Sequence, residues 1–320
     1  MLEANFSVIM SVFNSEIFLS EAIESILNQT LTNFEFIIID DGSTDNSSSI
    51  IQNYARKDPR IKLVENNINI GLARSLNKGI ELANGKYIAR MDADDISIPN
   101  RFEKQYHYLE NNQNIYVVGS NYKNIDENGN QKQQSEKLES PNQIRWGLFF
   151  SNQMAHPTVM MRTDLFKKYG YFYNPFPYTQ DYDLWIRISE KFDLSNLSDN
   201  LLFYRDHKNK ISNKYKSEQR NLDIDITIDH IKKTTLRELN YDQIKGLKNP
   251  RNIKSIEDAV MICSLLIKIQ SISQNWCLNK TDRNFINGMT FRKIKEIFYS
   301  NNFSIKLLPY FFHSIYKKLN

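Results

Sequence analysis

The stretch that decides the fold is YIARMDADD at residues 87–95, where a strand-like run ends in Asp92, Asp94 and Asp95 around a single alanine. Three earlier runs have the same short, apolar character: FSVIMSV (6–12), FEFIIID (34–40) and IKLVEN (61–66). Their apolar residues are nearly continuous rather than strictly alternating, which is typical of strands buried on both faces of a mostly parallel sheet. We therefore expect residues 87–95 to deliver three carboxylates to the end of a buried strand.

Helical patterns separate these strands. They occur at residues 15–30, 43–57 and 72–85. We expect Asn14 or Ser15 to cap the first helix and Gly85 to stop the third. Alternating strands and helices predict an α/β fold. The loops DDGS (40–43) and DADD (92–95) each follow a strand, and the carboxyl edge of an open α/β sheet is where ligands bind.

The second half of the chain is less regular. After a helix from Arg101 to about Asn111, the pattern predicts strands at 115–122, 156–162 and 200–205 and a helix at about 182–191. The dipeptide Asn128-Gly129 favours a hairpin, and the polar residues 129–143 are expected to form an exposed loop. Mainly helices follow Ser217, so we expect two domains, 1–216 and 217–320.

Composition narrows the class of protein. The 320 residues are 41% hydrophobic, which is enough for a sizeable core. Cys263 and Cys277 are too few for a disulfide framework, so a reducing compartment is expected. The first residues read as a strand and a turn rather than a secretion signal. The longest apolar run, 259–269, contains Ser264 and Lys268 and falls short of the roughly 20 residues that cross a bilayer.

Basic residues are concentrated near the C-terminus. Residues 251–320 carry 11 Lys and Arg against 4 Asp and Glu, whereas residues 1–250 carry 30 against 33. Residues 291–320 mix Phe, Tyr, Ile and Leu with Lys and Arg, a composition that can rest on an anionic membrane surface. The alternative is a helix that packs on the first domain and exposes a solvated basic face.

The carboxylates of Asp92 and Asp94 point to a cation. Two carboxylates one residue apart on a loop raise each other's pKa unless a cation intervenes. Oxygen ligands suit Mg²⁺ or Mn²⁺, and such ions commonly bind one or two carboxylates together with substrate phosphates. The pattern therefore indicates a divalent metal and a diphosphate ligand. The alternative is a solvated acidic turn that caps the next helix.

Several motifs together carry a resemblance to a known family. FSVIMSVFN, IIIDDGSTDNS, NIGLARSLNKGI, GKYIARMDADD and QDYDLW occur in the order and approximate spacing of the family 2 glycosyltransferases, over about residues 5–210. The resemblance implies a glycosyltransferase-A fold, with a Rossmann-like, mostly parallel sheet flanked by helices. Residues 1–216 would then bind a nucleotide sugar and catalyse its transfer, and residues 217–320 would form a helical, basic C-terminal region.

The resemblance also implies donor-binding residues. They are Ser11, Val12, Phe13, Asn14, Asp40, Asp41, Asn69, Gly71, Arg74, Asn77, Asp92 and Ala93. Residues 11–14 would line the nucleotide site largely through their backbone. Asp40 or Asp41 would contact the base, with Asp41 slightly favoured. The alternative is an Asp-Gly turn that caps the next helix, and adjacent aspartates could serve both roles. Arg74 would meet a phosphate or the base, unless it is a solvated helix residue.

Metal ligands are implied in the same way. Asp94 would bind the metal directly, and Asp92 would contact sugar or ribose hydroxyls or reach the metal through water. His207, in YRDH, resembles a family histidine that approaches the metal or the diphosphate, although a lone histidine is commonly structural. Asp95 is an extra carboxylate or a helix cap.

The catalytic base implied by the resemblance is Asp181, in TQDYDLWIR. Relatives often have Glu-Asp at this point, whereas this chain has Gln180 before Asp181. Asp181 would take the proton of an acceptor hydroxyl as its oxygen attacks the anomeric carbon, which inverts the configuration. Asp183 would cap the following helix, or serve as the base if Asp181 does not. His156 is expected to be structural or to face the acceptor.

The function expected from this resemblance is transfer of a hexosyl or N-acetylhexosaminyl group from a UDP-sugar to a saccharide acceptor. The acceptor would be lipid-linked, in bacterial surface-polysaccharide synthesis, at the cytoplasmic face of the membrane and without a nucleic-acid partner. The alternatives are a non-catalytic nucleotide-sugar-binding scaffold and a nucleotidyltransferase. The latter normally has a glycine-rich, basic loop near its first strand, which residues 11–18 lack. No G-x-G-x-x-G follows that strand either, which argues against a dinucleotide oxidoreductase.

Overall fold

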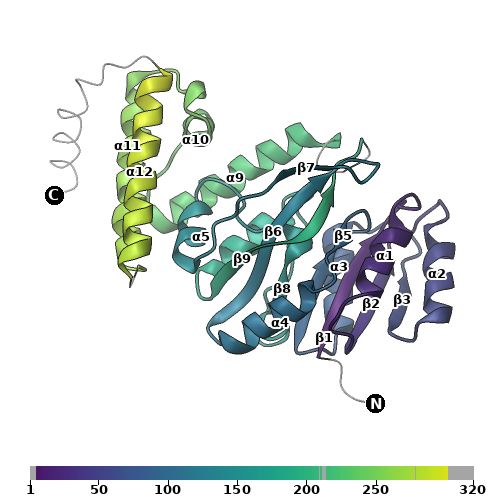
Figure 1. The fold of residues 1–320 in the computed structure, drawn as a ribbon. Coiled ribbons are helices and arrows are strands. Elements are labelled where there is room, and N and C mark those ends of the chain that lie inside the picture. The colour runs from purple at the N-terminus through teal and green to yellow at the C-terminus, as the bar shows by residue number, and fades with distance from the viewer. Residues whose placement is uncertain (1–4, 209, 211–213, 278, 302–320) are drawn as a thin grey trace. The chain divides into compact units, whose positions relative to one another are not determined.

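The computed structural model describes residues 5–208, 210, 214–277 and 279–301 (Figure 1). Its contacts divide the chain into two compact units. The α/β unit comprises residues 1–141 and 152–219, and the helical unit comprises residues 142–151 and 220–320. The candidate site residues named above all belong to the α/β unit.

Four parallel strands form the first half of the sheet, in the order β3-β2-β1-β4. They are β1 (Phe6–Val12), β2 (Phe34–Asp40), β3 (Ile61–Glu65) and β4 (Tyr87–Met91). The helices between them are α1 (Leu19–Leu27), α2 (Ser47–Lys57) and α3 (Leu72–Leu82). Every residue of β2 and β4 is buried. The predicted α/β fold with a buried sheet flanked by helices is therefore confirmed.

Helices cover both faces of this half-sheet because successive side chains of a strand point to opposite faces. Val8 and Met10 of β1 belong to a core that also includes residues of α1, α2 and α4 (Arg101–Asn111). Ile9, between them, faces α3, where the packing is so close that a Cβ at Gly79 would lie 2.7 Å from its side chain. The continuous apolar runs in the sequence reflect this burial on two sides.

The second half of the sheet is mixed. It continues from β4 in the order β8-β6-β9-β5, with β7 paired to β6. Its strands are β5 (Ile96–Ser97), β6 (Ile115–Ile125), β7 (Gln131–Gln134), β8 (Met160–Arg162) and β9 (Asp193–Arg205). β6 and β9 are parallel, and the other pairs in this half are antiparallel. Pairing of Ile96 with Phe203 brings the end of β9 beside the DADD loop.

The β6–β7 hairpin turns through Gly129 at φ +84°, as Asn128-Gly129 predicted. The prediction of an exposed loop at residues 129–143 was partly wrong, because Gln131–Gln134 form β7. The strand expected at 156–162 is shorter, since residues 156–158 form the 3₁₀ helix η1 (His156–Thr158). The expected helix near residues 182–191 is α7 (Gln180–Ser189), and a short helix, α6 (Asp164–Lys167), precedes it.

Two predicted helix signals have other roles. The N-cap of α1 is Phe18, so Asn14 and Ser15 do not cap this helix. Asn14 Oδ1 instead accepts a hydrogen bond from Thr44 N at 2.8 Å, which joins the loops that follow β1 and β2. α3 ends before Gly85, where a Cβ would lie 2.4 Å from the backbone of β1. Glycine is needed there for close packing rather than to stop the helix.

The helical unit has its own core, to which Trp146, Phe149, Ile231, Ile262 and Phe298 contribute. Its elements are α5 (Pro141–Gly147), α9 (Lys216–Thr235), α10 (Tyr241–Lys248), η2 (Pro250–Asn252), α11 (Ile256–Gln274) and α12 (Lys280–Ser300); the first residues of α5 and α9 belong to the α/β unit. Within the described part of the chain, no helix is both long and apolar enough to span a bilayer. Most of the basic, aromatic run at 291–320 lies outside the described residues, the last of which is residue 301.

Candidate active site

The loops that follow β1, β2 and β4 meet at the carboxyl edge of the sheet, as the parallel pairing requires. Asp41 N donates a hydrogen bond to Val12 O at 2.7 Å, which holds the first two loops together. Val12 is buried, Ser11 is half-buried, and Phe13 is 46% exposed. Residues 11–14 therefore lie beside the DDGS loop, and the Phe13 side chain is exposed to solvent.

Asp40 and Asp41 use their carboxylates differently. Asp41 Oδ1 accepts hydrogen bonds from Asn66 Nδ2 at 2.8 Å and Ile70 N at 3.0 Å, and its Oδ2 accepts one from Gly71 N at 2.9 Å. This carboxylate thereby holds the loop before α3, in which Gly71 has φ +90°. Among the described residues, the Asp40 carboxylate accepts one hydrogen bond, from Ser43 N to Oδ1 at 3.0 Å. Its second oxygen is the less committed acceptor of the pair.

The other expected nucleotide residues lie around the same loop. Asn69 and Arg74 are exposed. Asn77 is used differently, because its amide donates to Tyr173 O at 2.9 Å and accepts from Tyr173 N at 3.0 Å. Asn77 thus attaches α3 to the segment before α7, which a motif-based reading could not reveal.

The three aspartates of the DADD loop converge. Asp92, Asp94 and Asp95 each offer a carboxylate oxygen, and these oxygens lie within 4.8 Å of one another. The Asp95 side chain is fully buried, and burial raises its pKa to about 8. Its Oδ1 accepts a hydrogen bond from Arg205 N at 2.9 Å, whereas its Oδ2 has no partner among the described residues. Asp95 is not a helix cap, because α4 begins later and has Asn100 as its N-cap.

Two cations beside this cluster were missed by the sequence reasoning. Arg90 Nη2 forms an ion pair with Asp92, and Lys210 Nζ lies 3.4 Å from Asp95 and 3.9 Å from Asp94. A sequence signal existed for Arg90, because positions two apart in a strand point to the same side. None existed for Lys210, which reaches the cluster only because β9 pairs with β5.

The cluster fits a divalent metal ion. His207 Nε2 lies 2.8 Å from Asp94 Oδ2, so the structure brings together two of the expected ligands. Although burial alone would raise it, the His207 hydrogen bond and the Lys210 charge hold the pKa of Asp94 below its ordinary value. Carboxylate oxygens are the ligands that Mg²⁺ and Mn²⁺ prefer. Asp95 Oδ2, which has no partner in the described part of the chain, is a further acceptor that a cation would satisfy.

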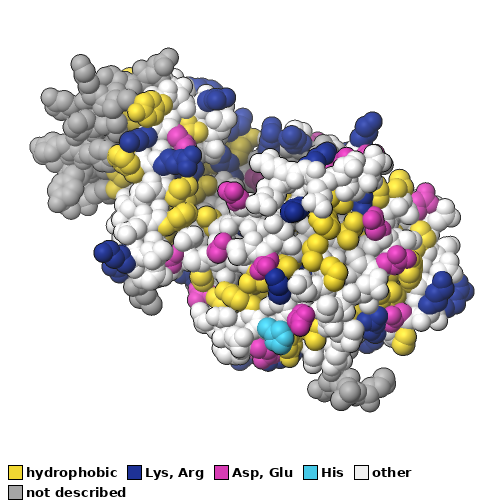
Figure 2. Space-filling model, viewed as in Figure 1, with side chains coloured by type: hydrophobic (Ala, Val, Ile, Leu, Met, Phe, Trp, Pro, Cys, Tyr) yellow, Lys and Arg dark blue, Asp and Glu magenta, His cyan; other side chains and the backbone are white. Residues whose placement is uncertain are grey.

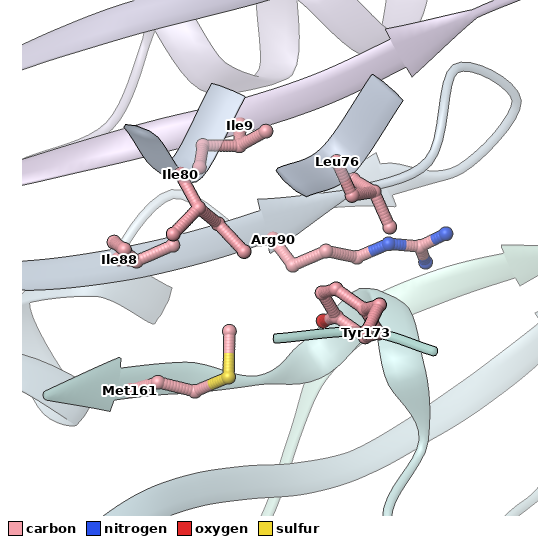
Figure 3. A pocket seen from close by; sticks show the side chains of 7 residues that line it. All are labelled: Ile9, Leu76, Ile80, Ile88, Arg90, Met161 and Tyr173. Carbon is pink, nitrogen blue, oxygen red and sulfur yellow. The ribbon is translucent and has the colours of Figure 1, made fainter. Parts of the chain in front are cut away.

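A small cavity borders Arg90 (Figure 3). Its volume is about 10 Å³, room for about one water molecule, and its lining is otherwise formed by Ile9, Leu76, Ile80, Ile88, Met161 and Tyr173. In Figure 3 the Arg90 guanidinium points away from Ile80, Ile88 and Met161 and passes between Leu76 and Tyr173. Its Nε and Nη1 are buried without a hydrogen-bond partner among the described residues. The cavity is too small for a sugar and is not a substrate site.

Asp181 lies in the first turn of α7. Its Oδ2 accepts a hydrogen bond from Asn152 Nδ2 at 2.7 Å. Burial raises the pKa of Asp181 above its ordinary value, although the Asn152 hydrogen bond and the Arg90 charge act in the opposite direction. A carboxylate whose pKa is raised toward neutral pH is a better proton acceptor than an ordinary aspartate.

Asp183 and His156 have structural partners. Asp183 Oδ2 accepts a hydrogen bond from Asn174 at 2.9 Å and forms an ion pair with Arg187 at 2.8 Å. The expectation that the Asp183 side chain would cap α7 was therefore wrong, because the N-cap of this helix is Thr179. His156 is buried, with Nε2 2.8 Å from Tyr173 Oη, and burial lowers its pKa well below the ordinary value. This environment suits the structural alternative for His156.

The sequence matches that of known proteins over most of the α/β unit. The sequence model of the protein family described as glycosyl transferase family 2 matches residues 7–170. An uncharacterized glycosyltransferase of Haemophilus influenzae is 38% identical, over 67% of this chain and 69% of its own length. The O-antigen biosynthesis glycosyltransferase WbnJ of Escherichia coli is also 38% identical, over 63% of this chain and 79% of its own length.

Solved structures share the fold. S. aureus TarS 1-349 in complex with UDP-GlcNAc has a TM-score of 0.61 at 19% identity, covering 93% of this chain and 92% of that one. The mannosyltransferase PcManGT from Pyrobaculum calidifontis, in complex with GDP-Man and Mn²⁺, has a TM-score of 0.55 at 15% identity, covering 92% and 86%. At these identities the likeness concerns the fold.

Proposed function

This chain belongs to glycosyltransferase family 2, and from that premise we propose that it moves a sugar from a nucleotide diphosphate donor to a hydroxyl of a saccharide acceptor, with inversion. The favoured donor is a UDP-sugar carrying a hexosyl or N-acetylhexosaminyl group. The observation that carries the proposal is the convergent cluster of Asp92, Asp94 and Asp95 in the α/β unit. Asp181, in the same unit and with a raised pKa, supports it. These are the two kinds of group that the transfer needs.

The donor end of the site would bind a diphosphate. Asp94, Asp92 and His207 are the proposed ligands of a Mn²⁺ or Mg²⁺ ion, which when bound would neutralise charge on the leaving diphosphate. Arg90 forms an ion pair with Asp92, and Lys210 Nζ lies near Asp94 and Asp95, so these two cations reduce the repulsion within the cluster. The uncommitted oxygen of Asp40 supports this residue as the contact to the base, while Asp41 shapes the loop that carries Asn69 and Gly71.

Asp181 is the proposed base. The acceptor oxygen forms a bond to the anomeric carbon as the bond from that carbon to the diphosphate breaks, and the acceptor proton moves to Asp181. A single displacement of this kind inverts the anomeric configuration and needs no covalent enzyme intermediate. The raised pKa of Asp181 supports the role, because a proton acceptor works best with a pKa near the operating pH.

A lipid-linked saccharide in surface-polysaccharide synthesis is the proposed acceptor, used at the cytoplasmic face of a membrane. The O-antigen relative supports this part of the proposal. So does the exposed face of α12, where Phe291, Lys295 and Tyr299 follow one another at four-residue spacing. Figure 2 shows hydrophobic and basic side chains interspersed over the helical unit on the face in view. Such a surface suits anionic lipid headgroups.

Turnover tests the proposal directly. The full chain is incubated with a panel of nucleotide sugars, Mn²⁺ and saccharide acceptors, and release of nucleoside diphosphate is measured. We expect release with at least one donor, and we expect Asp181→Asn to bind this donor normally while losing transfer. Tight, metal-dependent nucleotide binding without release for any donor would favour the scaffold alternative. Near-normal turnover by Asp181→Asn would move the base elsewhere, with Asp183 next to be tested.

A further inference from the structure

The contact between Asn152 and Asp181 has a consequence for the reaction. We propose that Asn152 is a positioning residue, which holds Asp181 Oδ2 so that the carboxylate stays ionised and directs its other oxygen at the acceptor hydroxyl. The two side chains come from segments 29 residues apart, and Asn152 Nδ2 lies 2.7 Å from Asp181 Oδ2. The inference rests on the proposed function, because it assumes that Asp181 is the base.

The orientation of the Asn152 amide follows from its second contact. Amide oxygen and nitrogen are assigned from their hydrogen-bond partners. Met154 N, which can only donate, points at Asn152 Oδ1 at 3.0 Å. The oxygen of the amide is therefore turned toward the backbone, and the NH₂ group is turned toward the carboxylate. Asn152 is thus fixed as a donor to Asp181 by its own chain.

Such a donor changes the chemistry of the carboxylate. A hydrogen bond to the charged form of an acid favours that form and lowers its pKa. Partial burial acts against ionisation of Asp181, so the Asn152 hydrogen bond keeps this half-buried base usable. Among the described residues, other charged or titratable groups that act on Asp181 include Arg90 from β4, Lys137 from the segment after β7, and Tyr173 from the segment before α7. Backbone N–H groups of Asp181 and Tyr182 also donate to this carboxylate, and Asn152 donates to it from a side chain at 2.7 Å.

A matched pair on the same helix provides the control. Asp183 also accepts a hydrogen bond from an asparagine, Asn174, at 2.9 Å, but the same Oδ2 also contacts the Arg187 guanidinium. The two asparagines therefore make the same kind of contact to aspartates two residues apart. Only Asn152 is expected to influence catalysis.

The experiment measures pH profiles of kcat and kcat/KM for the full chain and for Asn152→Ala, Asn152→Asp and Asn174→Ala. Loss of the hydrogen bond from Asn152 raises the pKa of Asp181. The acid limb of the profile should therefore move to higher pH by about one unit in Asn152→Ala. Activity at pH values below the acid limb then falls about tenfold, while the KM for the nucleotide sugar is unchanged. Asn152→Asp should move the limb further, because a second carboxylate faces Asp181. Asn174→Ala should leave it in place.

The outcomes separate the inference from the function that it assumes. An acid limb that stays at the wild-type pH in both Asn152 variants, or that moves equally in Asn174→Ala, overturns the positioning role. Active Asp181→Asn, or a wild-type chain without turnover, overturns the proposed base or function instead, and the inference with it. Thermal melts accompany each variant. If Asn152→Ala does not fold, Asn152→Asp decides the question, since it keeps the acceptor for Met154 N.

Discussion

Exchanging Asp41 and Asp40 separately for asparagine tests how the two aspartates divide their work. Asp41 is 2% exposed, and its carboxylate accepts three hydrogen bonds from described residues, two of them from the backbone of residues 70 and 71. An asparagine keeps one acceptor oxygen and turns an NH₂ group toward at least one of these donors. A hydrogen bond to a charged group contributes about 1.5–3 kcal/mol, and a buried donor left unpaired costs about 1–3 kcal/mol. We therefore expect Asp41→Asn to lower the free energy of unfolding by about 2–4 kcal/mol.

Asp40→Asn has a smaller structural effect, because the single bond from Ser43 N can be kept by the amide oxygen. Its expected loss is below about 1 kcal/mol. Urea and thermal unfolding measure the stability of both variants, and titration calorimetry with UDP measures their nucleotide affinity at a temperature where both are folded. We expect Asp40→Asn to weaken UDP binding with little change in stability.

Two results would refute this reasoning. Wild-type stability in Asp41→Asn would mean that the three contacts do not hold the loop before α3. Unchanged UDP affinity in Asp40→Asn would remove this residue as the contact to the base, and Asp41 would take its place in the proposal.

Three further predictions concern the metal, the packing and the membrane. Asp94→Ala should reduce metal-dependent donor binding and turnover by at least ~100-fold, since loss of a mere partner of a metal ligand already costs about 10–100-fold; binding that survives both this change and a chelator would contradict it. Gly85→Ala should lower the free energy of unfolding by about 2–3 kcal/mol, because its Cβ would meet the β1 backbone at 2.4 Å. Its control, Gly288→Ala, has open space in α12 and should raise that free energy by about 0.5–1 kcal/mol, and equal losses in both would reject the packing argument. The double change Lys295→Glu and Tyr299→Ser should abolish salt-sensitive binding to anionic vesicles, measured by co-sedimentation, whereas undiminished binding would exclude this face of α12 as the contact.

Local pattern was sufficient for much of the fold. The four parallel strands and their helices were predictable because burial on two faces leaves a continuous apolar run, and a helix leaves a 3.6-residue period. The end of α3 shows where such reasoning fails: Gly85 looked like a helix stop, yet it is required by the backbone of a strand about 80 residues earlier. The short strand β7 was missed because all of its residues are polar and exposed.

The candidate site likewise combines features that follow from local sequence with contacts that depend on the tertiary fold. The sequence by itself determined that Asp92, Asp94 and Asp95 stand at the end of a buried strand, beside a second acidic loop, because strand order and charge are local properties of the chain. Only the tertiary structure decided that Arg90 pairs with Asp92, that Lys210 and His207 reach Asp94, and that Asn152 holds Asp181. These contacts, except that of Arg90, join residues 29 to 116 positions apart, and they form because β5 pairs with β9 and α7 packs in the same unit. Pairing over such distances follows from the burial of whole elements, which no local period encodes.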